Sequence, residues 1–195
     1  MSTSVSGRTT TPANPAIDDA SAADSTGLRN LYLVRFGFAV LWAVLFAISA
    51  STINVASVIL LLVYPLFDVA AAVVDVRSSD AARLAAPLRI NMALSALATV
   101  GLAVAAGSGF PAVLRVWGAW AITAGVVQLV VALGRRRMGG QWAMIASGAI
   151  SAVAGTTFVI QAGRPDPSLA SLAGYATLGG IFFLVSALRL RRAAR

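Results

Sequence analysis

Six long apolar runs, separated by short polar segments, make up most of the chain. They cover residues 31–50, 53–76, 87–106, 111–133, 141–161 and 168–190. Each run is about as long as the roughly 20 residues that an α-helix needs to cross about 30 Å of hydrocarbon. No run alternates apolar and polar residues as a strand does, and backbone groups inside lipid must find partners within their own element. The pattern therefore predicts an all-α integral membrane bundle of six transmembrane helices.

The chain before the first run has a different composition. Residues 1–27 are mostly Ser, Thr, Ala, Pro and Asp, and they lack the charged start and apolar stretch of a secretory signal peptide. Such a segment buries too little apolar surface to offset its ordering entropy, so we expect a disordered tail. The predicted membrane domain then spans residues 28–192, and residues 193–195 form a basic C-terminal end.

The composition excludes most soluble classes of protein. Apolar residues make up 58% of the chain and charged residues 11%, whereas a soluble domain carries roughly 25% charged residues. Every base is Arg and every acid is Asp, and Lys, Glu, His and Cys are absent. Disulfides, zinc fingers and thiol or imidazole catalysis are thus excluded. We find no enzyme motif and expect a non-enzymatic protein without a cofactor or a metal site.

The net charge of +8 is explained by where the arginines lie. In a six-span topology most of them fall on one side, in the tail, in the links after the second and fourth runs, and at the C-terminus. The other side has Arg164 in its loops and Arg115 just inside the fourth run. This asymmetry predicts a cell-membrane protein with both termini in the cytoplasm and with contacts to anionic lipid head groups. It does not indicate nucleic acid as a partner.

The runs also suggest an internal repeat. Very short connections at 51–52 and 107–110 favour three hairpins, over 31–77, 87–136 and 141–190. Aromatic residues match at offsets of 56 and 55 residues in the second helix of each hairpin, at Tyr64, Trp120 and Tyr175. The same offsets relate Gly37, Ala93 and Gly148 in the first helices. Chance similarity among Ala-, Val- and Leu-rich helices stays open as the alternative.

Four segments carry a resemblance to a known family. They are AWAITAGVVQLVVALGRRRMGGQWAMIASGAISAVAG at 119–155, GYATLGGIFFLVSALRLRR at 174–192, and RFGFAVLWAVLFAI with YPLFDVAAAVVDVR in the first hairpin, which includes Asp68. Together they resemble the HdeD-like family of short-repeat bacterial membrane proteins. The chain departs from that pattern between paired helices, where Ser51-Thr52 and Gly109-Phe110-Pro111 stand, and in its third run. The resemblance implies a six-span bundle and a role in acid or envelope stress, but no reaction.

Ionisable groups inside the apolar runs need a reason, because each costs about 2.5–3.5 kcal/mol at a helix centre. Asp68 lies about eight residues from the cytoplasmic end of the second run, hence roughly 12 Å deep. Arg35 and Arg89 are its candidate partners, but both lie near their cytoplasmic ends and lean toward them, which favours contact with lipid head groups. Asp68 is then either a staple between helices or a proton-responsive group.

Uncharged polar residues form a second feature. Asn91, Ser95 and Thr99 lie at spacing four in the third run, and Gln128 lies in the fourth. Such groups mostly bond neighbouring helices. The alternative is a small transporter or channel with a polar path past Asp68, Asn91 and Gln128.

Several packing features complete the picture. Small residues at spacing four in the fifth run predict a close helix contact, inside the bundle or between copies in a homo-oligomer; they are Ala143, Ser147, Ser151 and Gly155. Pro65 is expected to kink the second run and free a carbonyl near Leu61. Aromatic residues beside arginines predict interface belts, Trp117 and Trp120 with Arg115 outside and Trp142 inside.

Overall fold

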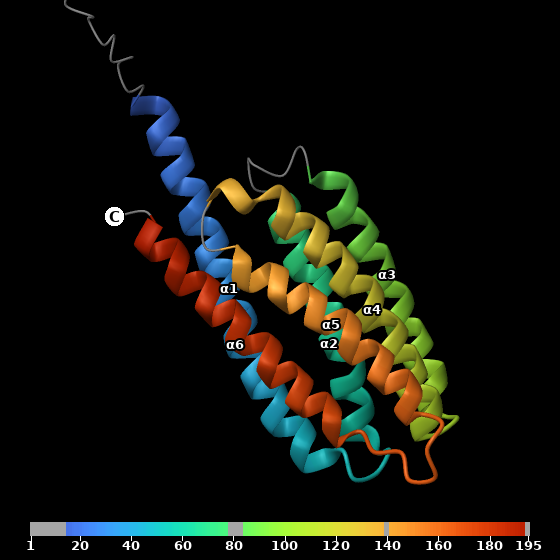
Figure 1. Ribbon diagram of the computed structural model, residues 1–195. Helices are drawn as coiled ribbons and strands as arrows, with labels where there is room; N and C mark the ends of the chain where they lie inside the picture. Colours follow the sequence, from blue (N-terminus) through green and yellow to red (C-terminus); the bar gives the residue numbers. More distant parts are fainter. Residues whose placement is uncertain (1–14, 78–83, 139–140, 194–195) are drawn as a thin grey trace, which may run out of the picture.

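A computed structural model describes residues 15–77, 84–138 and 141–193, with side chains described over 26–77, 84–138 and 141–190 (Figure 1). The elements in chain order are α1 (Pro15–Ser49), α2 (Val55–Val76), α3 (Ala85–Ala106), α4 (Phe110–Gly134), the short 3₁₀ helix η2 (Arg136–Met138), α5 (Trp142–Gln161) and α6 (Ala170–Ala193). No strand occurs in these ranges, so the predicted all-α class is confirmed.

Six helical segments of 20–25 residues within the described chain are long and apolar enough to cross a membrane. At 1.5 Å per residue they measure about 30–37 Å, which matches the hydrocarbon thickness of a bilayer. Their ends lie within about five residues of the predicted runs. The chain is a multi-pass membrane protein.

The first helix is longer than predicted. It begins at Pro15 and projects beyond the rest of the bundle (Figure 1), so residues 15–27 are helical where we expected a disordered tail. Proline is favoured in a first helical turn and alanine is the strongest helix former, so this segment can extend the membrane helix at little cost. The rest of the predicted tail, residues 1–14, lies outside the described residues, as do 194 and 195 of the predicted basic end.

The six helices form a closed ring in which each helix contacts the next and α6 contacts α1. The most extensive contacts join α4 to α5, α1 to α6 and α2 to α3, whereas the sparsest are those of α1 with α2 and of α5 with α6. We call these two sparse contacts the seams. They separate an α1/α6 pair from a four-helix unit of α2, α3, α4 and α5. The three predicted hairpins are therefore not confirmed as packing units, because two of them straddle a seam.

Glycines explain why α4 and α5 pack so closely. A Cβ atom added to Gly155 would lie 2.5 Å from the carbonyl oxygen of Gly118, and one added to Gly125 would lie 2.7 Å from that of Gly148. Both pairs place backbone directly against backbone, as small residues allow in lipid. The small-residue face predicted for α5 is thus used inside the bundle. Gly155, one of the predicted residues, makes the tightest contact, and Gly148, which the prediction of this face did not include, makes the next.

The two ends of the ring differ in character. One end, which we call the arginine-rich end, holds the last turns of α2, α4 and α6 and therefore Arg77, Arg135 to Arg137 and Arg189. The other end holds the loops between α1 and α2, α3 and α4, and α5 and α6. Local residues explain where the helices after two of these loops begin. Asn54 and Ser57 cap the start of α2 reciprocally, and Gly109, with a φ of 94°, allows the turn before α4.

Candidate functional site

An ion pair joins two helices deep in the bundle. The Arg35 guanidinium in α1 pairs with Oδ1 of Asp68 in α2, across the first seam. Asp68 lies eight residues before the end of α2, about 12 Å from it at 1.5 Å per residue, as predicted. The expectation that Arg35 would turn to lipid head groups is wrong. Its guanidinium instead lies over the Phe183 ring, 4.7 Å from the centroid, and this contact holds the charge inside the bundle.

The second carboxylate oxygen of Asp68 is bonded by α3. Asn91 Nδ2 donates to Oδ2 over 2.5 Å, and Ser95 Oγ donates to the same atom over 2.8 Å. Trp120 Nε1 in α4 in turn donates to Ser95 Oγ over 3.0 Å. Asp68 therefore receives hydrogen bonds from two helices besides its own. The predicted polar stripe of α3 is in part the support of this carboxylate.

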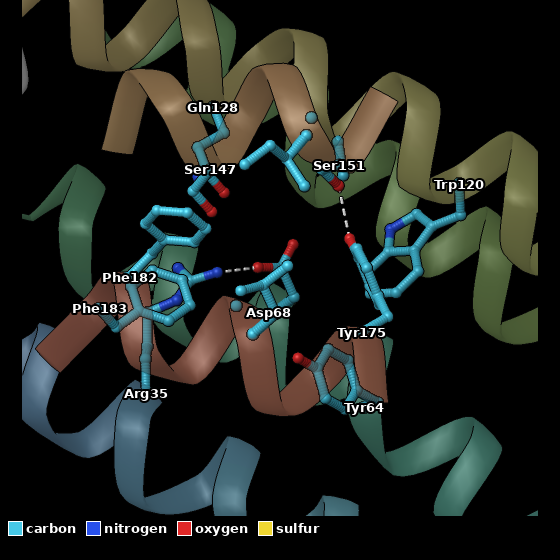
Figure 2. A pocket seen from close by; sticks show the side chains of 15 residues that line it. Arg35, Tyr64, Asp68, Trp120, Gln128, Ser147, Ser151, Tyr175, Phe182 and Phe183 are labelled. Atoms are coloured by element: carbon cyan, nitrogen blue, oxygen red, sulfur yellow. Dashed lines mark hydrogen bonds and ion pairs between the residues drawn. The ribbon is translucent and has the colours of Figure 1, made fainter. Parts of the chain in front are cut away.

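A cavity of about 60 Å³, which we call the central cavity, lies beside the ion pair (Figure 2). Arg35, Asp68, Gln128 and Ser147 supply polar groups, and aromatic rings supply much of the wall. The Ser151 and Tyr175 hydroxyls lie 2.5 Å apart across the second seam. Because Ser151 Oγ donates to the Ala121 carbonyl over 3.0 Å, the proton between the two hydroxyls comes from Tyr175.

The positions matched in the predicted repeat meet at this cavity. Tyr64, Trp120 and Tyr175 all line it, and Figure 2 shows the three rings on one side of Asp68. The residues one helical turn later, Asp68, Ala124 and Gly179, also line it. The first helices of the hairpins lack this equivalence, because Gly37 and Ala93 are exposed whereas Gly148 is buried against α4.

A second cavity of about 70 Å³, which we call the inner cavity, extends toward the arginine-rich end. It shares Arg35, Asp68 and Gln128 with the central cavity and adds Asn91. A space of this size holds several water molecules, since one water needs about 10–15 Å³ on this measure. Gln128 also donates from Nε2 to the Met144 carbonyl over 3.2 Å.

The inner cavity ends at a second ion pair, which sequence reasoning missed. Arg135 donates to both oxygens of Asp75, over 2.9 Å from Nη1 and 2.5 Å from Nη2, and the two side chains are 3% and 8% exposed. Tyr32 lies in the same wall and donates to Gln141 Oε1 over 3.4 Å. Burial lowers the pKa of Arg135, but the Asp75 carboxylate and Tyr32 together raise it by more, so the pKa is above its ordinary value and the guanidinium stays charged. The sequence did contain a signal for this second pair: Asp75 follows Asp68 by seven residues, about two helical turns, so both carboxylates lie on one face of α2.

The opposite half of the bundle is closed by a dry cluster. Its largest fully buried side chains come from five helices and the loop before α6, and they include Trp42, Phe46, Leu61, Leu102, Leu114, Trp117, Leu169 and Leu172. Trp42 stacks on Phe46 with ring centroids 4.5 Å apart. The prediction that Trp117 and Trp120 belong to an outer interface belt is therefore wrong. Trp117 is 0% exposed and Trp120 is 5% exposed, so both face the core. Trp142 is exposed at the arginine-rich end, where the Arg189 guanidinium lies 4.6 Å from its ring centroid.

Four of the five predicted site residues come together. Arg35, Asp68, Asn91 and Gln128 all line the inner cavity, whereas Arg89 is exposed on the first turns of α3 and lies outside the lining of both cavities.

Pro65 lies inside a continuous α2. We expected it to free a carbonyl near Leu61, and Trp42 Nε1 donates over 2.7 Å to the carbonyl of the neighbouring Leu60.

The site thus combines an ion pair at mid-membrane depth, two partly open cavities and a dry closure on one side. No protein-family model, curated protein or solved structure matches this chain.

Proposed function

We propose that this protein is a small membrane transporter in which Asp68 binds and releases protons that accompany a transported solute. The observation that carries the proposal is the Arg35–Asp68 ion pair, which borders two cavities in the middle of the membrane domain. Ionisable groups at this depth are expensive and typically line a pathway for protons or substrates. A staple between two helices needs no space beside it, whereas a transport site does.

The space beside the site extends toward one end of the bundle. Asp68 and Asp75 line the same inner cavity, whose volume of about 70 Å³ accommodates a short chain of waters. Beyond Tyr64, the apolar cluster around Trp42 and Trp117 separates the site from the loops at the other end. A site with space toward one end and a closed apolar cluster toward the other fits a carrier better than an open channel, because a carrier exposes its site to one side at a time.

The two seams divide the ring into two parts, the α1/α6 pair and the four-helix unit. Arg35 and Asp68 link them across the first seam, and Tyr175 and Ser151 link them across the second. Protonation of Asp68 removes the negative charge that holds Arg35, and so favours an arrangement in which the first seam is looser. Proton binding and movement of the α1/α6 pair are coupled in this way.

Proton flux into liposomes tests the proposal. Purified protein is reconstituted with a pH-sensitive dye inside, and a pH step is applied under a potassium diffusion potential. We expect flux above that of empty liposomes for the wild type and for Asp166→Asn, which neutralises an exposed loop carboxylate. For Asp68→Asn, which preserves side-chain size and removes the titration, we expect flux equal to that of empty liposomes. Wild-type flux no higher than that of empty liposomes, or equal flux for Asp68→Asn and the wild type, would refute it.

A role in acid or envelope stress is the wider function that the HdeD-like resemblance implies, and we propose it as the physiological setting. This setting fits the proposal that the buried Asp68 carboxylate takes part in proton transport. A deletion strain and a strain expressing Asp68→Asn should both survive an acid shock less well than the wild type. Equal survival of all three strains would refute the role in acid stress but would leave the transport function to be judged by the liposome experiment.

A further inference from the structure

The central cavity has an opening between α5 and α6, at the second seam. Ile150 on α5 and Leu178 on α6 both line the cavity and are 39% and 41% exposed. Ile150 lies eight residues after the start of α5 and 11 before its end, and Leu178 lies eight after the start of α6. At 1.5 Å per residue this is about 12 Å or more from either end of these helices. The opening therefore faces the hydrocarbon of the bilayer and not water.

Inside this apolar opening, the Arg35 guanidinium is the charged group that still offers hydrogen-bond donors to a ligand. A guanidinium carries five N–H groups, and within the described residues Arg35 uses one nitrogen to bond Asp68. Its side chain is 19% exposed and lines the cavity, and Figure 2 shows it pointing into the space below Ser147. Asp68, by contrast, already receives bonds on both oxygens. The cavity thus suits an oxygen acceptor, which a guanidinium binds best when it is a carboxylate.

We propose that the solute is a lipophilic carboxylic acid that enters the central cavity sideways from the bilayer, through the opening between α5 and α6. Its carboxylate binds Arg35, and its apolar part lies in the opening against Ile150, Leu178 and Gly179. The proposal rests on the proposed transport function and names the substrate class of the same site.

Charge balance explains why a proton accompanies this acid. The charged groups around the two cavities are Arg35 with Asp68 and Arg135 with Asp75, which sum to zero, and the other titratable groups facing Asp68 are Tyr64 and Tyr175. A bound carboxylate adds one negative charge in a medium that stabilises it poorly. Uptake of one proton by Asp68 from the inner cavity restores neutrality and frees Arg35 for the ligand. No other bond forms or breaks in this step.

Gly179 offers a way to close the opening without disturbing the fold. A Cβ atom on Gly179 meets nothing within 4 Å, so the backbone accepts a side chain there, and we expect a leucine to narrow the opening that Gly179 lines. Gly174 lies five residues earlier on α6, also meets nothing within 4 Å, and does not line the cavity. Gly174→Leu is therefore a matched control for Gly179→Leu.

Tryptophan quenching by a fatty acid brominated at mid-chain tests the proposal. The experiment uses protein in lipid nanodiscs with Trp142→Phe, which removes the lipid-exposed indole, so that Trp120 is the tryptophan lining the central cavity. We expect saturable quenching, unchanged in Gly174→Leu and shifted to about tenfold higher fatty acid concentration or more in Gly179→Leu. The methyl ester of the same acid should quench far less.

Equal quenching curves for the two leucine variants would overturn the lateral entry, and equal quenching by acid and methyl ester would overturn the carboxylate. Unsaturable quenching would overturn both. Because binding is measured at equilibrium and without a pH gradient, this result is independent of the proton flux that tests the proposed function.

Discussion

At the scale of single residues, the two ion pairs differ in what they leave free. Arg135 bonds Asp75 with two nitrogens and its side chain is 3% exposed, whereas Arg35 bonds Asp68 with one nitrogen, is 19% exposed and lines both cavities. A bidentate, buried pair has a fixed geometry and little to offer a ligand. We therefore assign the pair at the arginine-rich end to stability and the central pair to function.

Neutralising one member of the Arg135–Asp75 pair should be costly. Asp75→Asn leaves the Arg135 charge buried without its carboxylate, and breaking a buried pair in this way costs about 3–5 kcal/mol. We expect Arg135→Gln to cost a similar amount and the double variant to cost less than the sum. Unfolding of the purified protein in mixed micelles, followed by circular dichroism, measures these free energies.

The run of three arginines supplies the control for this prediction. Arg137→Gln removes the same charge at an exposed position two residues away and should change the unfolding free energy by less than about 0.5 kcal/mol. Since the pKa of Arg135 is raised, the stability it contributes is present below its ordinary value and lost only as the pH rises through the raised value. The difference between Arg135→Gln and Arg137→Gln should thus persist across the physiological pH range. Equal losses for the two variants would contradict the assignment.

Which of these residues the sequence predicts depends on their depth. Asp68 is conspicuous because a carboxylate in the middle of an apolar run needs a partner. Asp75 is not, because charges near a helix end are common. The direction of Arg35 could not be predicted, since helix geometry alone points it to the nearer interface, and only the cavity and the Phe183 ring provide an alternative.

At the scale of helices, the sequence predicts well where each span lies but predicts poorly which helices pack against each other. Span length follows from bilayer thickness, so the six runs match the six helices closely. Pairing depends on which small residues meet, and several helices carry candidates. Gly148 and Gly155 meet α4, whereas Gly37 and Gly174 meet nothing within 4 Å, and nothing in their spacing distinguishes the two sets.

Alanine substitution should lower the stability of the protein at a glycine that contacts another helix and should not lower it at a glycine that contacts none. In Gly155→Ala the new methyl group would lie 2.5 Å from the Gly118 carbonyl oxygen and 2.8 Å from the Ile122 backbone nitrogen, so α4 and α5 must move apart. Such overpacking costs about 1–3 kcal/mol. In Gly174→Ala the methyl group meets no atom, and the helix gains up to about 1 kcal/mol in propensity. The melting temperature should fall for the first variant and stay equal or rise for the second. A fall of the same size in both would argue against the close α4–α5 contact.

At the scale of the whole molecule, polarity is distributed unevenly along the membrane normal. The half toward the arginine-rich end contains both ion pairs and the inner cavity, whereas the other half is closed by the apolar cluster. If the arginine-rich end faces the cytoplasm, the inner cavity extends from the site toward the cytoplasm, as far as the buried Arg135–Asp75 pair. In the proposed transport function, the orientation of the protein therefore decides which compartment supplies the proton.

Cysteine labelling can measure this orientation directly, because the chain has no cysteine of its own. Ser108→Cys places one thiol in the exposed loop between α3 and α4, and Arg137→Cys places one at the exposed arginine-rich end. Arginine-rich loops are retained in the cytoplasm, so a membrane-impermeant maleimide should label Ser108→Cys in intact cells and Arg137→Cys only after permeabilisation. The unsubstituted chain controls for background. Labelling of Arg137→Cys in intact cells would reverse the orientation, and the inner cavity would then take its protons from outside the cell.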